Sequence, residues 1–117
     1  MTDKITIRGK EITFTANGAT PLYYKQFFHR DLLKSITVED DTITIGTEYI
    51  PDLAFIMAKQ ADKADMLHLQ QKTYYEWLEN FDPLDLTMAA EEIFNVYLSD
   101  SIPTEEPKKK EDADPKE

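Results

Sequence analysis

Two short segments near the N-terminus, residues 4–8 and 11–15, alternate apolar and polar positions. The apolar positions of this alternation are Ile5, Ile7, Ile12 and Phe14. A period of two with β-branched residues is typical of strands that bury one face. Gly9-Lys10 lies between the segments, and glycine at the first central position suits a two-residue hairpin turn. Because a lone hairpin is unstable in water, we expect its apolar face to pack on the rest of the chain.

Apolar residues recur with helical spacing from about residue 20. Pro21 follows Thr20, which predicts a helix with a threonine hydroxyl as its N-cap and proline in its first turn. Asp31 is placed to cap a second short helical stretch at residues 32–36. The first helix holds the aromatic residues Tyr23, Tyr24, Phe27 and Phe28.

One further strand and three helices are predicted downstream. We expect the strand at residues 42–45, after the charged turn Glu39-Asp40-Asp41, and the helices at residues 51–67, 73–81 and 84–98. Asp52 lies near the positive end of the first of these helices, and Thr73 is placed to cap the second. The stretch 53–58 is nearly all apolar, so we expect it to form the buried centre of the domain.

Together these elements predict an α+β fold, with a small N-terminal β-hairpin or sheet packed on a mainly helical body. We expect a single domain over residues 1–98. From Ser99 onward the chain has three prolines and one large apolar residue, Ile102. Such a segment cannot offset the entropy lost on ordering, so residues 99–117 are predicted to be a disordered, charged tail.

The net charge of the 117-residue chain is −10, and the charge is unevenly distributed. Residues 1–36 hold six basic against three acidic side chains, whereas residues 37–100 hold three basic against 14 acidic ones. Two interpretations stay open. The acidic surface keeps a small protein in solution, or the asymmetry favours stacking of copies or binding to a basic partner.

The sequence offers little reactive chemistry. It contains no cysteine, and its two histidines, His29 and His68, lie far apart, so no metal site is predicted. The glycines are isolated, and no serine stands in a nucleophile motif. No apolar run approaches the roughly 20 residues that span a bilayer. We therefore expect a cytoplasmic protein that is not an enzyme and has no cofactor, metal or membrane partner.

The aromatic residues at positions 23–28 admit two interpretations. With neighbouring basic side chains they resemble the stacking surface of a single-strand nucleic-acid binder, or they fill the core of a small domain. Because the remaining surface is acidic and would repel phosphate, we expect no nucleic-acid partner. The residues expected in the core are Phe27 and Leu33, and those expected on a partner-binding surface are Tyr24, Phe28 and Arg30.

Several short motifs occur in an order typical of one protein family. The N-terminal hairpin leads into ATPLYYKQFFHRDLLKSI (residues 19–36), PDLAFIMAKQADKADM (51–66), TYYEWLENFDPLD (73–85) and EIFNVYL (92–98), before a charged, proline-rich tail. Over about residues 4–110 this order resembles the small tail assembly chaperones encoded by siphophages and prophages of Gram-positive bacteria. The likeness rests on apolar motifs rather than on a catalytic signature.

The resemblance implies a protein that acts while a long non-contractile tail is built. Such chaperones bind the tape measure protein, keep its apolar helical stripes in solution and help to recruit tail tube subunits. The resemblance also implies weak self-association of copies along one rod, action in the host cytoplasm and absence from the mature virion.

The tail adds a further implication of the resemblance. Family members are often made in two forms, the longer one arising when ribosomes slip on a repetitive codon run. Pro107-Lys108-Lys109-Lys110 would be encoded by an A-rich stretch, and a frameshifted form would contact the tail tube protein. A solvated linker with a chance lysine run is the other interpretation of these residues.

A second functional hypothesis rests on charge alone. The chain would then be an acidic regulatory protein or nucleic-acid mimic that occupies the basic groove of a protein partner. This hypothesis predicts salt-sensitive binding to a basic protein and indifference to the helices of a tape measure protein.

Overall fold

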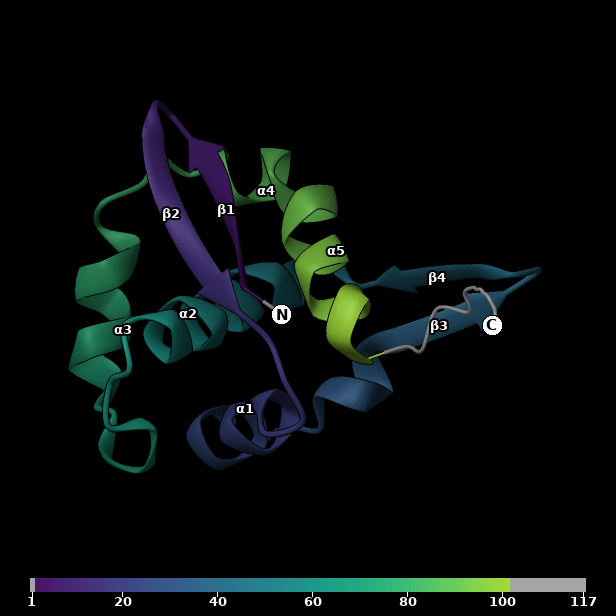
Figure 1. Ribbon diagram of the computed structural model, residues 1–117, viewed down its shortest axis with the longest axis horizontal. Coiled ribbons are helices and arrows are strands. Elements are labelled where there is room, and N and C mark those ends of the chain that lie inside the picture. Colours follow the sequence, from purple (N-terminus) through teal and green to yellow (C-terminus); the bar gives the residue numbers. More distant parts are fainter. Residues whose placement is uncertain (1, 102–117) are drawn as a thin grey trace, which may run out of the picture.

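The computed structural model describes residues 2–101 and confirms the α+β fold (Figure 1). Figure 1 shows α2 behind a two-stranded hairpin, with α3 and α5 on either side. The strands are β1 (Thr2–Ile7), β2 (Lys10–Thr15), β3 (Ile36–Glu39) and β4 (Thr42–Ile45). The α-helices are α1 (Thr20–Phe28), α2 (Ile50–Ala61), α3 (Gln71–Leu78), α4 (Asp85–Met88) and α5 (Ala90–Ser101). Single 3₁₀ turns are η1 (Leu32–Ser35), η2 (Thr47–Tyr49) and η3 (Met66–His68).

The predicted N-terminal hairpin is present, but its turn lies one residue earlier than expected. Ile5 pairs with Ile12 and Ile7 with Lys10, so the two central residues are Arg8 and Gly9. Both have positive φ values, 51° and 76°, which is the type I′ geometry that matches the twist of a hairpin. Glycine is therefore favoured at the second central position here, not at the first.

Helix α2 forms the centre of the core, as the apolar pattern predicts. Residues 53–57 are fully buried, and β2 and α1 pack against this helix. The helix ends at Ala61 rather than at residue 67, because Lys63 adopts a left-handed conformation with φ 58°. The Lys63 and Ala64 amides then donate to the carbonyls of Gln60 and Lys59 at 3.0 and 3.1 Å, which is a Schellman ending.

Two of the predicted helix caps fail and one is confirmed. Thr20 is buried, and its hydroxyl donates to Gln60 Oε1 at 2.7 Å instead of capping α1. Thr73 lies inside α3, which begins at Gln71. Asp31 does cap η1, because its carboxylate accepts the Leu33 amide at 3.0 Å.

The predicted strand at residues 42–45 is confirmed, and it pairs with a strand, β3, that the sequence pattern did not reveal. We call the β3–β4 hairpin, residues 36–45, the arm; it points away from the helices (Figure 1). Asp40 and Asp41 form its turn, with φ values of 47° and 66°. Val38 pairs with Ile43 and Ile36 with Ile45, so these four side chains share one apolar side of the arm.

The predicted C-terminal helix is divided in two. Ala89 leaves helical geometry with φ −95° and ψ 8° and separates α4 from α5. Helix α5 continues to Ser101, beyond the predicted end of the domain at residue 98. Most of the tail predicted at 99–117 lies outside the described residues. Within residues 2–101, no helix is long and apolar enough to cross a membrane.

Candidate functional site

A carboxylate buried between three helices organises the aromatic residues of this fold. Asp52, in the first turn of α2, is 7% exposed. Its Oδ2 accepts the Tyr24 hydroxyl of α1 at 3.2 Å, and its Oδ1 accepts the Tyr74 hydroxyl of α3. Arg30 donates to Oδ2 and supplies the opposite charge. A buried carboxylate is stable only with such partners, so this group, the Asp52 cluster, fixes how α1, α2 and α3 meet.

Arg30 also lies against three aromatic rings. Its Cζ is 4.9 Å from the ring centroid of Tyr49 and 5.9 Å from those of Tyr24 and Phe28. These distances permit cation–π attraction, while 44% of the side chain stays exposed. The arginine therefore closes the Asp52 cluster on its solvent side.

The core and surface positions predicted for this region agree only partly with the structure. Phe27 is buried, as expected, but Tyr24 is fully buried, so the expectation that it lies on the surface is wrong. Phe28 is half-buried and Arg30 is exposed, and both touch Tyr24 through ring contacts. Leu33 was expected in the core but is 59% exposed. The neighbouring Leu32 faces inward instead, because successive residues of a 3₁₀ turn point about 120° apart.

Burial changes the acidity of the two tyrosines that donate to Asp52. Removal from water disfavours the phenolate and raises the pKa of Tyr24 to about 12 and that of Tyr74 to about 12. The Arg30 charge opposes this shift in both pKa values, but its effect is smaller than that of burial. Both hydroxyls therefore remain protonated donors at neutral pH.

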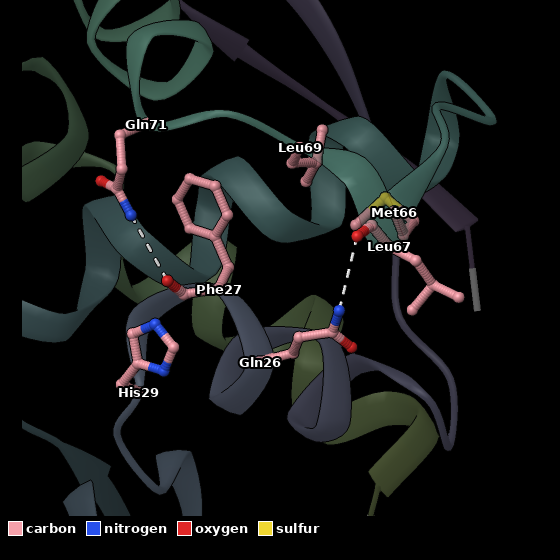
Figure 2. Close-up of a pocket in the computed structure, with 7 residues that line it drawn as sticks. All are labelled: Gln26, Phe27, His29, Met66, Leu67, Leu69 and Gln71. Carbon is pink, nitrogen blue, oxygen red and sulfur yellow. Dashed lines mark hydrogen bonds between the residues drawn. The ribbon is translucent and has the colours of Figure 1, made fainter.

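A small hollow lies between the C-terminal half of α1 and residues 66–71 (Figure 2). Its volume is about 190 Å³. Figure 2 shows the Gln26 amide donating to the Leu67 carbonyl and the Gln71 amide donating to the Phe27 carbonyl, each at 3.4 Å. His29 is the one titratable side chain among the lining residues, so the hollow contains no acid–base pair for catalysis.

A larger and more apolar groove separates the arm from α5. Its volume is about 310 Å³. One wall is the strand Thr42–Ile45, the opposite wall contains Ala90, Glu91 and Phe94, and Ile50 lies between them. The groove was not predicted, because β3, and with it the arm, was not recognised in the hydrophobic pattern. A second alternating segment before the charged turn, Ile36 and Val38, was the signal that could have indicated it.

Within residues 2–101, no three histidine, aspartate or glutamate side chains gather in a way that could hold a metal ion. Comparisons of the chain with protein-family models, with curated proteins and with solved structures gave no match. The function is therefore inferred from the surface of this fold and from the resemblance of its motifs.

Proposed function

We propose that this protein is a tail assembly chaperone of a phage or prophage that binds apolar helical stripes of the tape measure protein. It acts by covering surface that would otherwise aggregate, without catalysis. The resemblance of the motifs at residues 19–36, 51–66, 73–85 and 92–98 supports the family. The observation that carries the binding role is the apolar side of the arm.

The apolar side of the arm continues the core outward into solvent. At its base, Ile36 and Ile45 pack against the buried core. Toward the tip, Ile43 is half-buried and Val38 is 66% exposed. Ile43 still packs against the core, whereas Val38 is mostly exposed, so Val38 and the exposed part of Ile43 can take up apolar side chains of a partner.

Two exposed apolar residues at α4 offer a second surface that a partner helix could cover. Leu84 is 66% exposed and Met88 is 82% exposed. Leu84 directly precedes this short helix and Met88 is its last residue. The Met88 amide donates to the Leu84 carbonyl at 2.9 Å, so the two side chains share one side. Methionine adapts its shape to different apolar partners, which suits a chaperone that meets many stripes along one rod.

The other expectations for the family belong to the same proposal. A longer, frameshifted form would recruit tail tube protein, and copies would associate weakly along the tape measure protein. The protein would act in the host cytoplasm and leave before the virion is complete.

The test is co-expression with a phage tape measure protein. We expect wild type to keep that protein in the soluble fraction after lysis. Val38→Ser should lower the soluble amount several-fold, because it removes apolar surface from an exposed position. Thr37→Ser changes the opposite side of the same strand and should behave as wild type. Equal soluble amounts with and without the chaperone would contradict the proposed function.

A second candidate is an acidic protein that binds a basic protein partner. It is favoured by the charge of the segment from residue 36 to residue 58, which has no lysine or arginine but includes the exposed residues Glu39, Asp40, Asp41 and Glu48. This candidate predicts binding that weakens steeply between low and high salt. Binding to the apolar stripes of a tape measure protein should instead persist at high salt.

A further inference from the structure

We propose that the outer edge of β4 binds an extended segment of a partner protein, which adds a third strand to the arm. This goes beyond the proposed function, because the contact with helical stripes uses side chains on the apolar side of the arm. Strand addition uses the backbone of β4 and the groove between β4 and α5. The two surfaces adjoin but can be altered separately.

The register of the arm shows which backbone groups lie at this edge. Glu39 pairs with Thr42 directly across the two-residue turn, and such a pair exchanges both of its hydrogen bonds. Because bonded and non-bonded pairs alternate, Thr42 and Thr44 bond to β3. The Gly46 amide donates to the Ser35 carbonyl at 3.3 Å, which continues the same alternation. The N–H and C=O groups of Ile43 and Ile45 therefore point away from β3.

These outward groups have no strand beside them in the part of the chain that the structure describes. The sheet contains two strands, β3 and β4, and Figure 1 shows the arm standing apart from the helices. Folded proteins commonly protect such an edge with lysine, proline or a bulge. The strand Thr-Ile-Thr-Ile has none of these, so its edge is open to pairing.

The groove runs along this edge rather than under one side of the arm. Thr42, Ile43, Thr44 and Ile45 all line it. Successive residues of a strand point to opposite sides, so a cavity touched by four in a row follows the backbone edge. Ile50 and Phe94 are apolar residues of the groove lining and are 0% and 7% exposed, so they form its closed apolar wall. A segment paired with β4 could place alternate side chains against them.

Charge identifies the partner segment as basic. Glu39, Asp40 and Asp41 surround the tip of the arm, and Glu91 lines the groove. Pairing of β4 with β4 of a second copy would bring the acidic tip of each copy toward Glu48 of the other, which is repulsive. The occupant that fits is a partner segment in which β-branched apolar residues alternate with lysine or arginine.

The test uses the full chain and a synthetic peptide with blocked ends, about eight residues long, that alternates isoleucine and lysine. Backbone hydrogen exchange followed by NMR reports the contact residue by residue. We expect the peptide to slow exchange of the Ile43 and Ile45 amides by about tenfold or more. The amides of Thr42 and Thr44 already bond to β3 and should change little.

Two control peptides make the result specific. One carries N-methyl groups on the residues whose amides would face β4, which removes the donors and keeps the side chains. We expect its affinity to fall about tenfold or more. The other has the same composition with helical spacing and should not slow exchange at Ile43 or Ile45. Equal binding of the N-methylated peptide, or no binding of the alternating peptide, would overturn the proposal.

Variants separate this inference from the proposed function. Ile45→Pro removes an outward N–H while the bonds between β3 and β4 remain, so the peptide should bind about tenfold more weakly than to Ile45→Val. Val38→Ser changes the apolar side and leaves the edge intact, so it should bind the peptide as wild type does. If wild type solubilises the tape measure protein and Val38→Ser does so several-fold less well, but Ile45→Pro still binds the peptide fully, the strand-addition site is wrong while the chaperone function stands.

Discussion

The guanidinium of Arg30 lies over the ring of Tyr49, with Cζ 4.9 Å from the ring centroid. The two residues precede and follow the segment 31–48, which contains η1 and the arm. Their contact therefore closes the base of the arm. Because Arg30 also donates to Asp52, the base is fixed to α2 and through it to the core.

Arg30→Met is the first prediction, and it tests this closure. The variant keeps most of the aliphatic bulk but leaves the buried Asp52 carboxylate without its counter-ion. We expect the free energy of unfolding to fall by about 2 kcal/mol, less than for a fully buried pair because the arginine is partly exposed. Urea denaturation measures this change.

Lys34→Met is the matched control for Arg30→Met. Lys34 is an exposed cation of η1 in the same segment, so its loss removes charge without opening the Asp52 cluster. We expect its free energy of unfolding to stay within about 0.5 kcal/mol of wild type. Similar losses for the two variants would mean that Arg30 acts only through the net charge.

The alkaline limit of stability is the second prediction. The pKa values of Tyr24 and Tyr74 rise from 10.0 to about 12 in the folded protein. Above pH 10 the unfolded chain therefore loses these protons before the folded protein does, so the unfolded state binds fewer protons. The stabilisation is complete below pH 10 and is lost as the pH rises through 12. Thermal unfolding midpoints from pH 8 to pH 12 should fall accordingly.

Tyr74→Phe tests the assignment of this alkaline limit. The variant loses one hydrogen bond to Asp52, which lowers stability near neutral pH by about 1 kcal/mol. Its midpoint should then fall less steeply than that of wild type above pH 10. Tyr75→Phe alters an exposed neighbour on the same helix and should keep the wild-type slope. An unchanged slope in Tyr74→Phe would contradict the buried-tyrosine explanation.

The sequence predicted those parts of the fold that repeat regularly. The period of two in residues 4–15 predicts the β1–β2 hairpin, and the apolar run at residues 53–58 predicts the buried helix α2. Both patterns are readable because burial of apolar side chains determines the structure of these segments. The ends of α2 and of the last helix were missed, because a left-handed Lys63 and a non-helical Ala89 decide them. Neither residue is one that ordinarily signals a helix end.

The candidate site was less predictable than the fold. Tyr24 and Phe28 stand four residues apart on α1, so helical spacing gave them similar positions. Tertiary contacts distinguish them, because Asp52 of α2 draws the Tyr24 hydroxyl inward. From its position in the sequence, Asp52 was predicted only to interact with the positive end of the helix dipole. Its burial follows from partners 22 and 28 residues away, which no local pattern contains.

The turn of the first hairpin gives the third prediction. Gly9 has a φ of 76°, and a Cβ added there meets nothing within 4 Å. Gly9→Ala should therefore destabilise the protein by about 1 kcal/mol through backbone conformation alone. Gly18 has equally open surroundings without a left-handed φ, so Gly18→Ala should be neutral or slightly stabilising. Equal effects in thermal unfolding would contradict the left-handed turn.

The acidic turn of the arm gives the fourth prediction. Asp40 and Asp41 both hold the left-handed conformation that Asn-Gly adopts more easily, and they repel each other and Glu39. Asp40→Asn combined with Asp41→Gly should stabilise the arm by about 1 kcal/mol. Slower hydrogen exchange at Thr44, which bonds to β3, measures this gain. Faster exchange would show that the aspartates support the turn.

The same double variant should weaken the binding of basic segments while it stabilises the arm. Two negative charges leave the tip, so a lysine-rich peptide loses electrostatic attraction, and its affinity should fall several-fold at low salt and little at high salt. Glu79→Gln, at an exposed position directly after α3, removes a charge away from the arm and serves as the control. Asp40 and Asp41 would then lower the stability of the arm while they raise its affinity for a basic segment. Such a trade of stability for binding is expected of residues that serve a binding surface. If the double variant stabilises the arm but binds the peptide as tightly as wild type, the two aspartates contribute only to solubility and not to binding.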